Sequence, residues 1–170
     1  YLGFDGVTEK PYIKKYGKKM LGIKKSALRN CKKTGLAVVL VTCIIPHEND
    51  NELGDIIAFA KSNMPTVKGV YLQPISYFGI YPKEDIRRIT IPEVLRSLEL
   101  QTNGEISIND FSPGAYEHPQ CSFNGCFVLS KDNRLKSLTC FSKKERSSEG
   151  YKRIRQSIKK AWMPSHVPML

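Results

Sequence analysis

The sequence predicts an α/β fold built around a parallel sheet. From residue 1 to about 102, short apolar stretches alternate with amphipathic ones in the order strand, helix, strand, helix, strand, helix. Alternation with short connections is typical of right-handed βαβ units, whose strands pair in parallel. The chain has 170 residues, of which 41% are hydrophobic, so it is large enough to bury a core.

The first unit combines a short strand at 1–7 with a lysine-rich helix. Pro11 is compatible only with a first helical turn or a loop between them. In 18–33, apolar residues recur every three or four positions, which predicts an amphipathic helix. The predicted buried positions are Met20, Ile23, Ala27 and Cys31, with Leu28 beside them. Gly35 follows the last periodic residue and is expected to end the helix.

The second and third strands are expected at 36–45 and 67–77. The first of these is an unbroken apolar, β-branched run, which predicts burial on both faces of the sheet. Gln73 falls inside the third strand, where a buried amide would demand hydrogen-bond partners.

Two pairs of residues have the three-residue spacing of a capping box, which marks the start of a helix. They are Asn49 with Glu52, and Thr90 with Glu93. The predicted buried stripes of the two helices are Leu53, Ile56, Ile57 and Ala60 in the first, and Val94, Leu95, Leu98 and Leu100 in the second.

The pattern changes after Asn103, and we predict a domain over 1–111 followed by an extension over 112–170. Residues 106–111 are expected to form one more short strand. The expected elements of the extension are a Cys- and His-containing loop (112–125), a hairpin (126–130 with 135–139) and a basic amphipathic helix (148–163).

The net charge of +11 is concentrated in two windows, 9–33 and 143–160, which hold 18 of the 27 cations. One interpretation is attraction to nucleic-acid phosphates. The other, which we favour, is the solvated outer faces of helices, because lysines outnumber arginines and no aromatic residues are interleaved with the charges.

Other features limit the compartment and the class of chemistry. Five cysteines without a secretory leader favour a reducing cytoplasm, and the longest apolar run, 36–45, is too short to span a bilayer. The chain begins at Tyr1 rather than Met, which suggests that upstream sequence is missing. The sequence contains no P-loop, G-x-G-x-x-G motif or Ser-His-Asp order.

Five segments resemble radical S-adenosylmethionine (radical SAM) enzymes. They are Leu2–Val7, which is similar to the S-x-D-G segment of the fourth strand; Val38–Asp50 and Val70–Gly79, which are similar to the fifth and sixth strand segments; Glu117–Phe123, which resembles a C-terminal loop of the uncharacterised or pterin-methylating branch; and the helix at Glu149–Trp162. They follow one another in the right order and are distributed along most of the chain, from residue 2 to residue 162.

The resemblance implies the C-terminal half of a partial (β/α)6 TIM-like barrel. The complete enzyme would bind SAM and a [4Fe-4S] cluster, take an electron from a donor, and cleave SAM to a 5′-deoxyadenosyl radical that modifies, for example methylates, a small-molecule substrate. The family's cluster motif, C-x3-C-x2-C, is absent from this chain. We therefore expect the fragment alone to be inactive.

The resemblance places candidate cofactor-binding residues at the strand ends, where α/β folds hold their ligands. They are Gly3, Asp5, Thr42, Asn49, Gln73 and Ser76. For Asp5 the alternative is a turn aspartate, and for Asn49 a helix cap. We identify no catalytic residue from the sequence.

Other interpretations stay open. His118, Cys121 and Cys126 are candidate ligands for zinc or an auxiliary iron–sulfur cluster, although their spacing is not that of a standard zinc motif. The alternative is a loop histidine with unpaired thiols. For the whole chain, one alternative is a basic nucleic-acid-binding module. The other is an inactive remnant, because Gly3 stands where the family has a polar residue.

Overall fold

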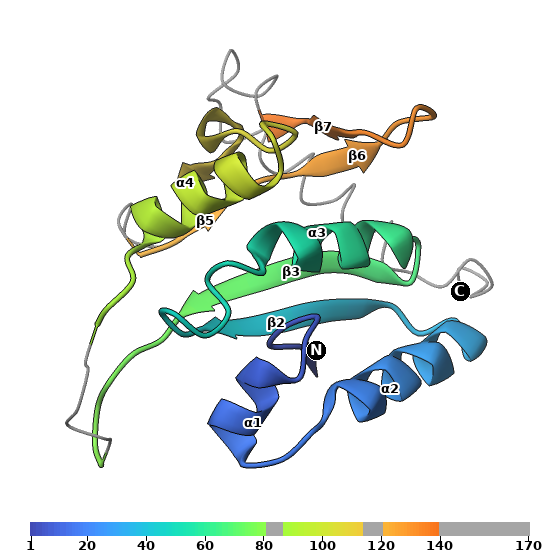
Figure 1. The fold of residues 1–170 in the computed structure, drawn as a ribbon. Helices are drawn as coiled ribbons and strands as arrows, with labels where there is room; N and C mark the ends of the chain where they lie inside the picture. Colours follow the sequence, from blue (N-terminus) through green and yellow to red (C-terminus); the bar gives the residue numbers. More distant parts are fainter. Residues whose placement is uncertain (81–86, 114–120, 140–170) are drawn as a thin grey trace, which may run out of the picture. The chain divides into compact units, whose positions relative to one another are not determined.

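The computed structural model describes residues 1–80, 87–113 and 121–139 (Figure 1). It divides the chain into two compact units, Tyr1–Gly104 and Glu105–Leu170. Among the described residues, no helix combines the length and apolarity needed to cross a membrane.

The first unit is built on a three-stranded sheet. Strands β1 (Leu2–Gly3), β2 (Val38–Ile44) and β3 (Val67–Pro74) lie in that order and all run parallel. The structure thereby confirms the α/β class and the parallel sheet. Strand β1 is shorter than the predicted 1–7, although the Phe4 N–H continues the ladder with a 2.8 Å bond to the Val41 carbonyl.

Four helices connect or follow these strands: α1 (Lys10–Tyr16), α2 (Leu21–Lys33), α3 (Leu53–Ser62) and α4 (Ile91–Gln101) (Figure 1). Pro11 lies in the first turn of α1, where a missing N–H costs no helical bond. Helix α4 begins with the predicted capping box of Thr90 and Glu93.

The core lies on one face of the sheet. Residues of β2 that face α2 and α3 are buried, and they alternate with partly exposed ones. The buried cluster consists of Phe4, Leu28, Val38, Leu40, Ile56, Ala60 and Val67. The predicted burial of β2 on both faces is therefore wrong within the described part of the chain, because both helices cover the same side.

The buried stripe of α2 differs from the predicted one. Ile23 is 62% exposed, whereas Leu21, Leu28 and Cys31 pack against the core. The predicted positions Leu28 and Cys31 are confirmed, whereas Ile23 lies outside the stripe and Lys24 is partly buried. The apolar residues of this helix are spaced so evenly that the sequence fits more than one choice of the side that faces the core.

The second unit contains short elements. A 3-10 helix, η1 (Ile108–Asp110), replaces the strand predicted at 106–111, because Ser107 and Asp110 cap each other across a tight turn. The strands are β4 (Ser112–Pro113) paired with β5 (Phe123–Asn124), and β6 (Phe127–Leu129) paired with β7 (Leu135–Ser137), both antiparallel. The helix predicted at 148–163 lies outside the described residues.

Helix α3 begins where α4 ends, and Gly54 makes this approach possible. Its N–H donates to Gln101 Oε1 at 3.0 Å, and Gln101 Nε2 donates to the Asp50 carbonyl at 2.7 Å. A β-carbon on Gly54 would lie 2.6 Å from the Gln101 carbonyl oxygen. Because that neighbour is backbone, it cannot rotate away.

We predict that Gly54→Ala lowers the free energy of unfolding by about 1–3 kcal/mol through overpacking. The matched control is Gly22→Ala in α2, where nothing lies within 4 Å of the added carbon. That change should raise the free energy of unfolding by about 0.5–1 kcal/mol, since alanine is the better helix former. Urea denaturation of both variants measures the difference, and equal effects would contradict this view of the α3–α4 junction.

Candidate functional site

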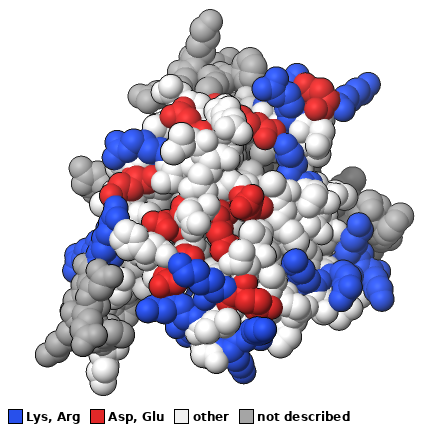
Figure 2. Space-filling view, in the orientation of Figure 1, with Lys and Arg blue, Asp and Glu red and all other residues white. Residues whose placement is uncertain are grey.

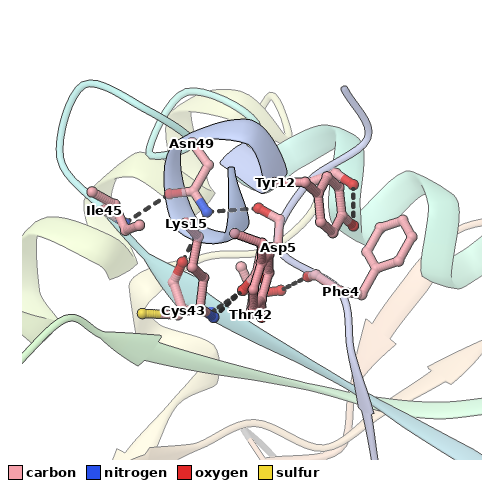
Figure 3. A network of polar contacts seen from close by, with 10 residues as sticks. Phe4, Asp5, Tyr12, Lys15, Thr42, Cys43, Ile45 and Asn49 are labelled. Atoms are coloured by element: carbon pink, nitrogen blue, oxygen red, sulfur yellow. Dashed lines mark hydrogen bonds and ion pairs between the residues drawn. The ribbon is translucent and has the colours of Figure 1, made fainter. Parts of the chain in front are cut away.

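The carboxyl ends of β1 and β2 meet in a buried polar network (Figure 3). Its centre is the Asp5 carboxylate, which is 1% exposed. Asp5 Oδ1 accepts hydrogen bonds from Lys15 Nζ at 2.9 Å and from the Cys43 N–H at 3.1 Å. Asp5 Oδ2 accepts from the Tyr16 hydroxyl at 3.1 Å. Asp5 therefore joins two strands and α1, rather than bonding within its own turn.

The network keeps Lys15 positively charged. Burial lowers the pKa of Lys15, but its hydrogen bonds to Asp5 and Tyr16 and the charge of Asp5 outweigh that effect, so the pKa lies above its ordinary value. The Lys15 side chain is still 31% exposed. At neutral pH this site thus presents a fixed, partly accessible ammonium group.

Cys43, by contrast, is held in its neutral form. Its pKa is raised, chiefly by burial, so the side chain is a neutral thiol at neutral pH. Cys43 is partly exposed rather than the fully buried small hydrophobe expected from an apolar strand. Its main contribution to the network is the backbone N–H that Asp5 accepts.

Asn49 joins the two strand ends from the loop before α3. Its Oδ1 accepts from the Ile45 N–H at 2.7 Å, and its Nδ2 donates to the carbonyls of Asp5 at 2.6 Å and Cys43 at 2.8 Å. The side chain is fully buried. All these bonds go to backbone groups that the ends of the strands would otherwise leave unpaired.

The capping box predicted for Asn49 and Glu52 is wrong. Helix α3 begins after Glu52 without a side-chain cap bond. The Glu52 carboxylate instead accepts from the N–H groups of Val7, at 2.7 Å, and Thr8, at 3.1 Å, and from the Thr8 hydroxyl. The strand ends and the segment after β1 therefore take up both side chains that the local spacing assigned to the helix start.

The remaining predicted site residues divide between the two faces of the sheet. Thr42 is fully buried on the helix-covered face, where its hydroxyl donates to the Phe4 carbonyl at 2.7 Å. Gly3 pairs with Val41, and Gln73 with Cys43, on the opposite face. Gln73 is exposed, so its predicted burial is wrong. Ser76 is also exposed and follows the end of β3.

The uncovered face of the sheet forms a wide, mostly apolar depression of about 610 Å³. The residues that line it are Tyr1, Val39, Val41, Gly69, Val70, Tyr71 and Gln73. Its volume lies within the range of small-molecule sites, roughly 300–1,000 Å³. The structure thus brings Gly3 and Gln73 to one open face, while Asp5, Thr42 and Asn49 are engaged inside the protein.

Lys15 and Tyr16 are the network members that sequence reasoning missed. Both lie in a lysine-rich stretch, which suggests only a solvated helix face. Two other cations of this stretch, Lys10 and Lys14, lie 3.4 and 3.9 Å from the Glu48 carboxylate. On the face drawn in Figure 2, acidic side chains lie between basic ones. Binding of nucleic acid stays a prediction.

The candidate metal ligands of the second unit are only partly described. Cys121 is exposed, Cys126 is half-buried with its pKa raised by burial, and His118 lies outside the described residues. Within 1–80, 87–113 and 121–139, no three His, Cys, Asp or Glu side chains are grouped in a way that could hold a metal ion. The zinc or auxiliary-cluster interpretation stays a prediction.

Comparison with known proteins gives one informative similarity. No protein-family model matches the sequence. The chain is 45% identical over 116 residues to a protein of Methanocaldococcus jannaschii named 7,8-dihydro-6-hydroxymethylpterin dimethyltransferase. The match covers 66% of this chain and 23% of the relative, so the matched segment spans less than a quarter of the length of that protein.

We predict that Asn49→Ala lowers the free energy of unfolding by about 2–4 kcal/mol, because it leaves buried backbone groups of Ile45, Asp5 and Cys43 without partners. Asn51→Ala is the matched control at an exposed position nearby, and should change stability by no more than about 0.5 kcal/mol. Chemical denaturation measures both. A loss for Asn49→Ala no larger than the control would show that the network does not hold the strand ends.

Proposed function

We propose that this chain is part of a radical SAM enzyme that methylates a pterin-related heterocycle. The observation that carries the proposal is the order of β1, β2 and β3, which are parallel and adjacent as the resemblance requires. The name of the Methanocaldococcus relative supports a methylating enzyme and a pterin substrate.

In this proposal, the open face of the sheet contributes to the binding of SAM or substrate. Tyr71 is 51% exposed and presents an aromatic ring beside Val39 and Val41. A flat heterocycle can stack on such a ring and cover apolar strand surface. Gln73, at the carboxyl end of the same face, supplies both a donor and an acceptor to hydrogen-bond such a ligand.

We assign a different role to the buried polar residues. Asp5, Thr42 and Asn49 direct their hydrogen bonds to the protein itself and fix the positions of the strand ends. They act as positioning residues for the exposed groups beside them, and Gly3, Gln73 and Ser76 remain the candidate contacts. A site held in this way loses less entropy when a ligand binds.

The residues of this chain do not fit an iron–sulfur cluster. Three closely spaced thiolates are needed, and the sequence has no C-x3-C-x2-C motif. In the described ranges, moreover, the cysteines do not form a metal-binding group. The proposal therefore requires the cluster ligands to come from outside these 170 residues, and we assign no cluster chemistry to this chain.

The test uses the full-length protein, prepared without oxygen and reconstituted with iron and sulfide. We expect 5′-deoxyadenosine to form when SAM and dithionite are added, and label from methyl-labelled SAM to appear in a reduced hydroxymethylpterin. Failure to form 5′-deoxyadenosine in a preparation with a complete cluster would refute the radical SAM assignment. Formation of 5′-deoxyadenosine without pterin labelling would refute the substrate alone.

A variant ties this activity to the open face. Gln73→Ala should raise the KM for SAM or for the pterin about five- to tenfold through the loss of hydrogen bonds, with kcat changed less. Lys68→Ala is the control on the same strand, because Lys68 is exposed and lies outside the depression. If both variants match the wild type, the open face does not form the site.

A further inference from the structure

The outer side of helix α2 and the turn before it carry six exposed positive charges, which we call the α2 basic face. They are Lys18 and Lys19 in the turn, and Lys25, Arg29, Lys32 and Lys33 in the helix. The spacing of the last four places them on one side of the helix. In Figure 2, basic side chains gather at the right of the view, where α2 ends in Figure 1.

Negative charge is nearly absent from this part of the chain. The sequence has no Asp or Glu between Lys10 and His47. The Glu9 carboxylate does lie at the start of α2, where it accepts from the N–H groups of Met20 at 2.9 Å and Leu21 at 3.1 Å. Counted against the six cations, this one carboxylate leaves a net charge of 6 − 1 = +5 on the α2 basic face.

Helix α1, by contrast, has its charges balanced by carboxylates from other segments. Lys10 and Lys14 lie 3.4 and 3.9 Å from Glu48, and Lys15 lies 2.9 Å from Asp5. In residues 1–80, 87–113 and 121–139, none of the six cations of the α2 basic face lies within 4.0 Å of a carboxylate. The fold therefore divides the lysine-rich window into a balanced helix and an unbalanced one.

The unbalanced charge works against the helix that carries it. Lys25 with Arg29, and Arg29 with Lys33, are like charges four residues apart, a spacing at which they repel and destabilise a helix. A helix face that is merely solvated usually mixes charges of both signs. The arrangement is explained if a ligand with many negative charges binds there.

The geometry favours the phosphates of nucleic acid as those charges. At a rise of 1.5 Å per residue, Lys25, Arg29 and Lys33 follow one another about 6 Å apart along the helix. A nucleic-acid backbone presents phosphates in a regular row, so several of these cations can neutralise phosphates together. No aromatic residue lies between Lys18 and Lys33, and such contacts therefore read no base.

A lipid membrane fits this surface less well. Helices that bind the membrane interface bury an apolar side between the lipids. The apolar side of α2, with Leu21, Leu28 and Cys31, packs instead against the protein core. Ile23 is 62% exposed, but it lies among polar neighbours and gives the helix no second apolar side.

We infer that the α2 basic face binds the phosphodiester backbone of nucleic acid without regard to base sequence. Helix α2 covers the core side of the sheet, so this surface and the open face lie on opposite sides of it. The inference stands on the charges of α2 alone and does not depend on the reaction proposed above.

The competing explanation is that α2 is a solvated helix that adds only to the net charge. A fourfold variant tests this by replacing Lys25, Arg29, Lys32 and Lys33 with Gln, which is as good a helix former as Lys. The matched control removes four exposed charges elsewhere, at Lys10, Lys14, Lys68 and Lys131, also with Gln. Both variants keep the basic window at 143–160, so any contribution from it is equal in both.

The experiment titrates a fluorescent DNA duplex of about 20 base pairs with the full chain and follows the anisotropy at about 50–200 mM salt. We expect a micromolar dissociation constant at the lowest salt, and a slope of about −4 to −5 in log K against log salt. A duplex of unrelated sequence should bind equally well. The same duplex made of RNA tells which nucleic acid binds more tightly.

The fourfold variant should bind at least about tenfold more weakly at the lowest salt, with a slope smaller in magnitude by about 3. The control should lose less than about threefold and keep its slope. Circular dichroism and urea denaturation check that both are folded. Arg29→Gln alone, at the centre of the face, should reduce the slope by about 1 and gives the same test with a single substitution.

Polyglutamate and vesicles containing phosphatidylglycerol serve as competitors that separate the other occupants. Four outcomes would overturn the inference: no binding of the duplex by the wild type at the lowest salt, equal losses in the fourfold variant and the control, displacement by polyglutamate at equal charge, which indicates an acidic protein, or tighter binding to the vesicles. None of these outcomes bears on the formation of 5′-deoxyadenosine, so this inference and the proposed function fail independently.

Discussion

The buried amide of Asn49 is the interaction on which the rest of the sheet's carboxyl edge depends. Parallel strands that end inside a protein leave backbone donors and acceptors without ladder partners. Asn49 pairs with the carbonyl of Asp5, which follows β1, with the carbonyl of Cys43 on β2, and with the N–H of Ile45 after β2. With the strand ends fixed in this way, the Asp5 carboxylate can reach the Cys43 N–H and hold Lys15 at the same edge.

The one-sided packing of the sheet follows from where its helices lie. Helices α2 and α3 both cover the face that carries Val38 and Leu40, so the core forms there, while Val39 and Val41 on the opposite face are only partly buried. The accessible face is nevertheless apolar around Val39, Val41 and Tyr71. A wide apolar depression bordered by polar strand ends is compatible with a small-molecule site in an α/β protein.

The sequence predicts the order of the elements better than the direction of individual side chains. Alternating apolar runs were enough to predict three parallel strands, and Thr90 with Glu93 caps α4 as its local spacing indicates. Asn49 and Glu52 have the same spacing, yet Glu52 binds Val7 and Thr8, more than forty residues away, and Asn49 binds backbone groups of the strand ends, among them the distant Asp5 carbonyl. A motif defined by local spacing carries no information about such competing partners. In α2, likewise, the spacing of the apolar residues did not show that Ile23 faces away from the core.

The candidate site was harder to predict because its charged groups are indistinguishable in the sequence from their neighbours. Nine lysines lie between residues 9 and 33, and composition assigns all of them to solvated faces. The fold separates them: Lys10 and Lys14 lie near Glu48, Lys15 binds a buried carboxylate, and Lys24 lies over a glycine. Lys15 differs from the others because burial reduces its hydration, and a charge with reduced hydration needs an electrostatic partner. Lys15 has that partner in Asp5, at 2.9 Å.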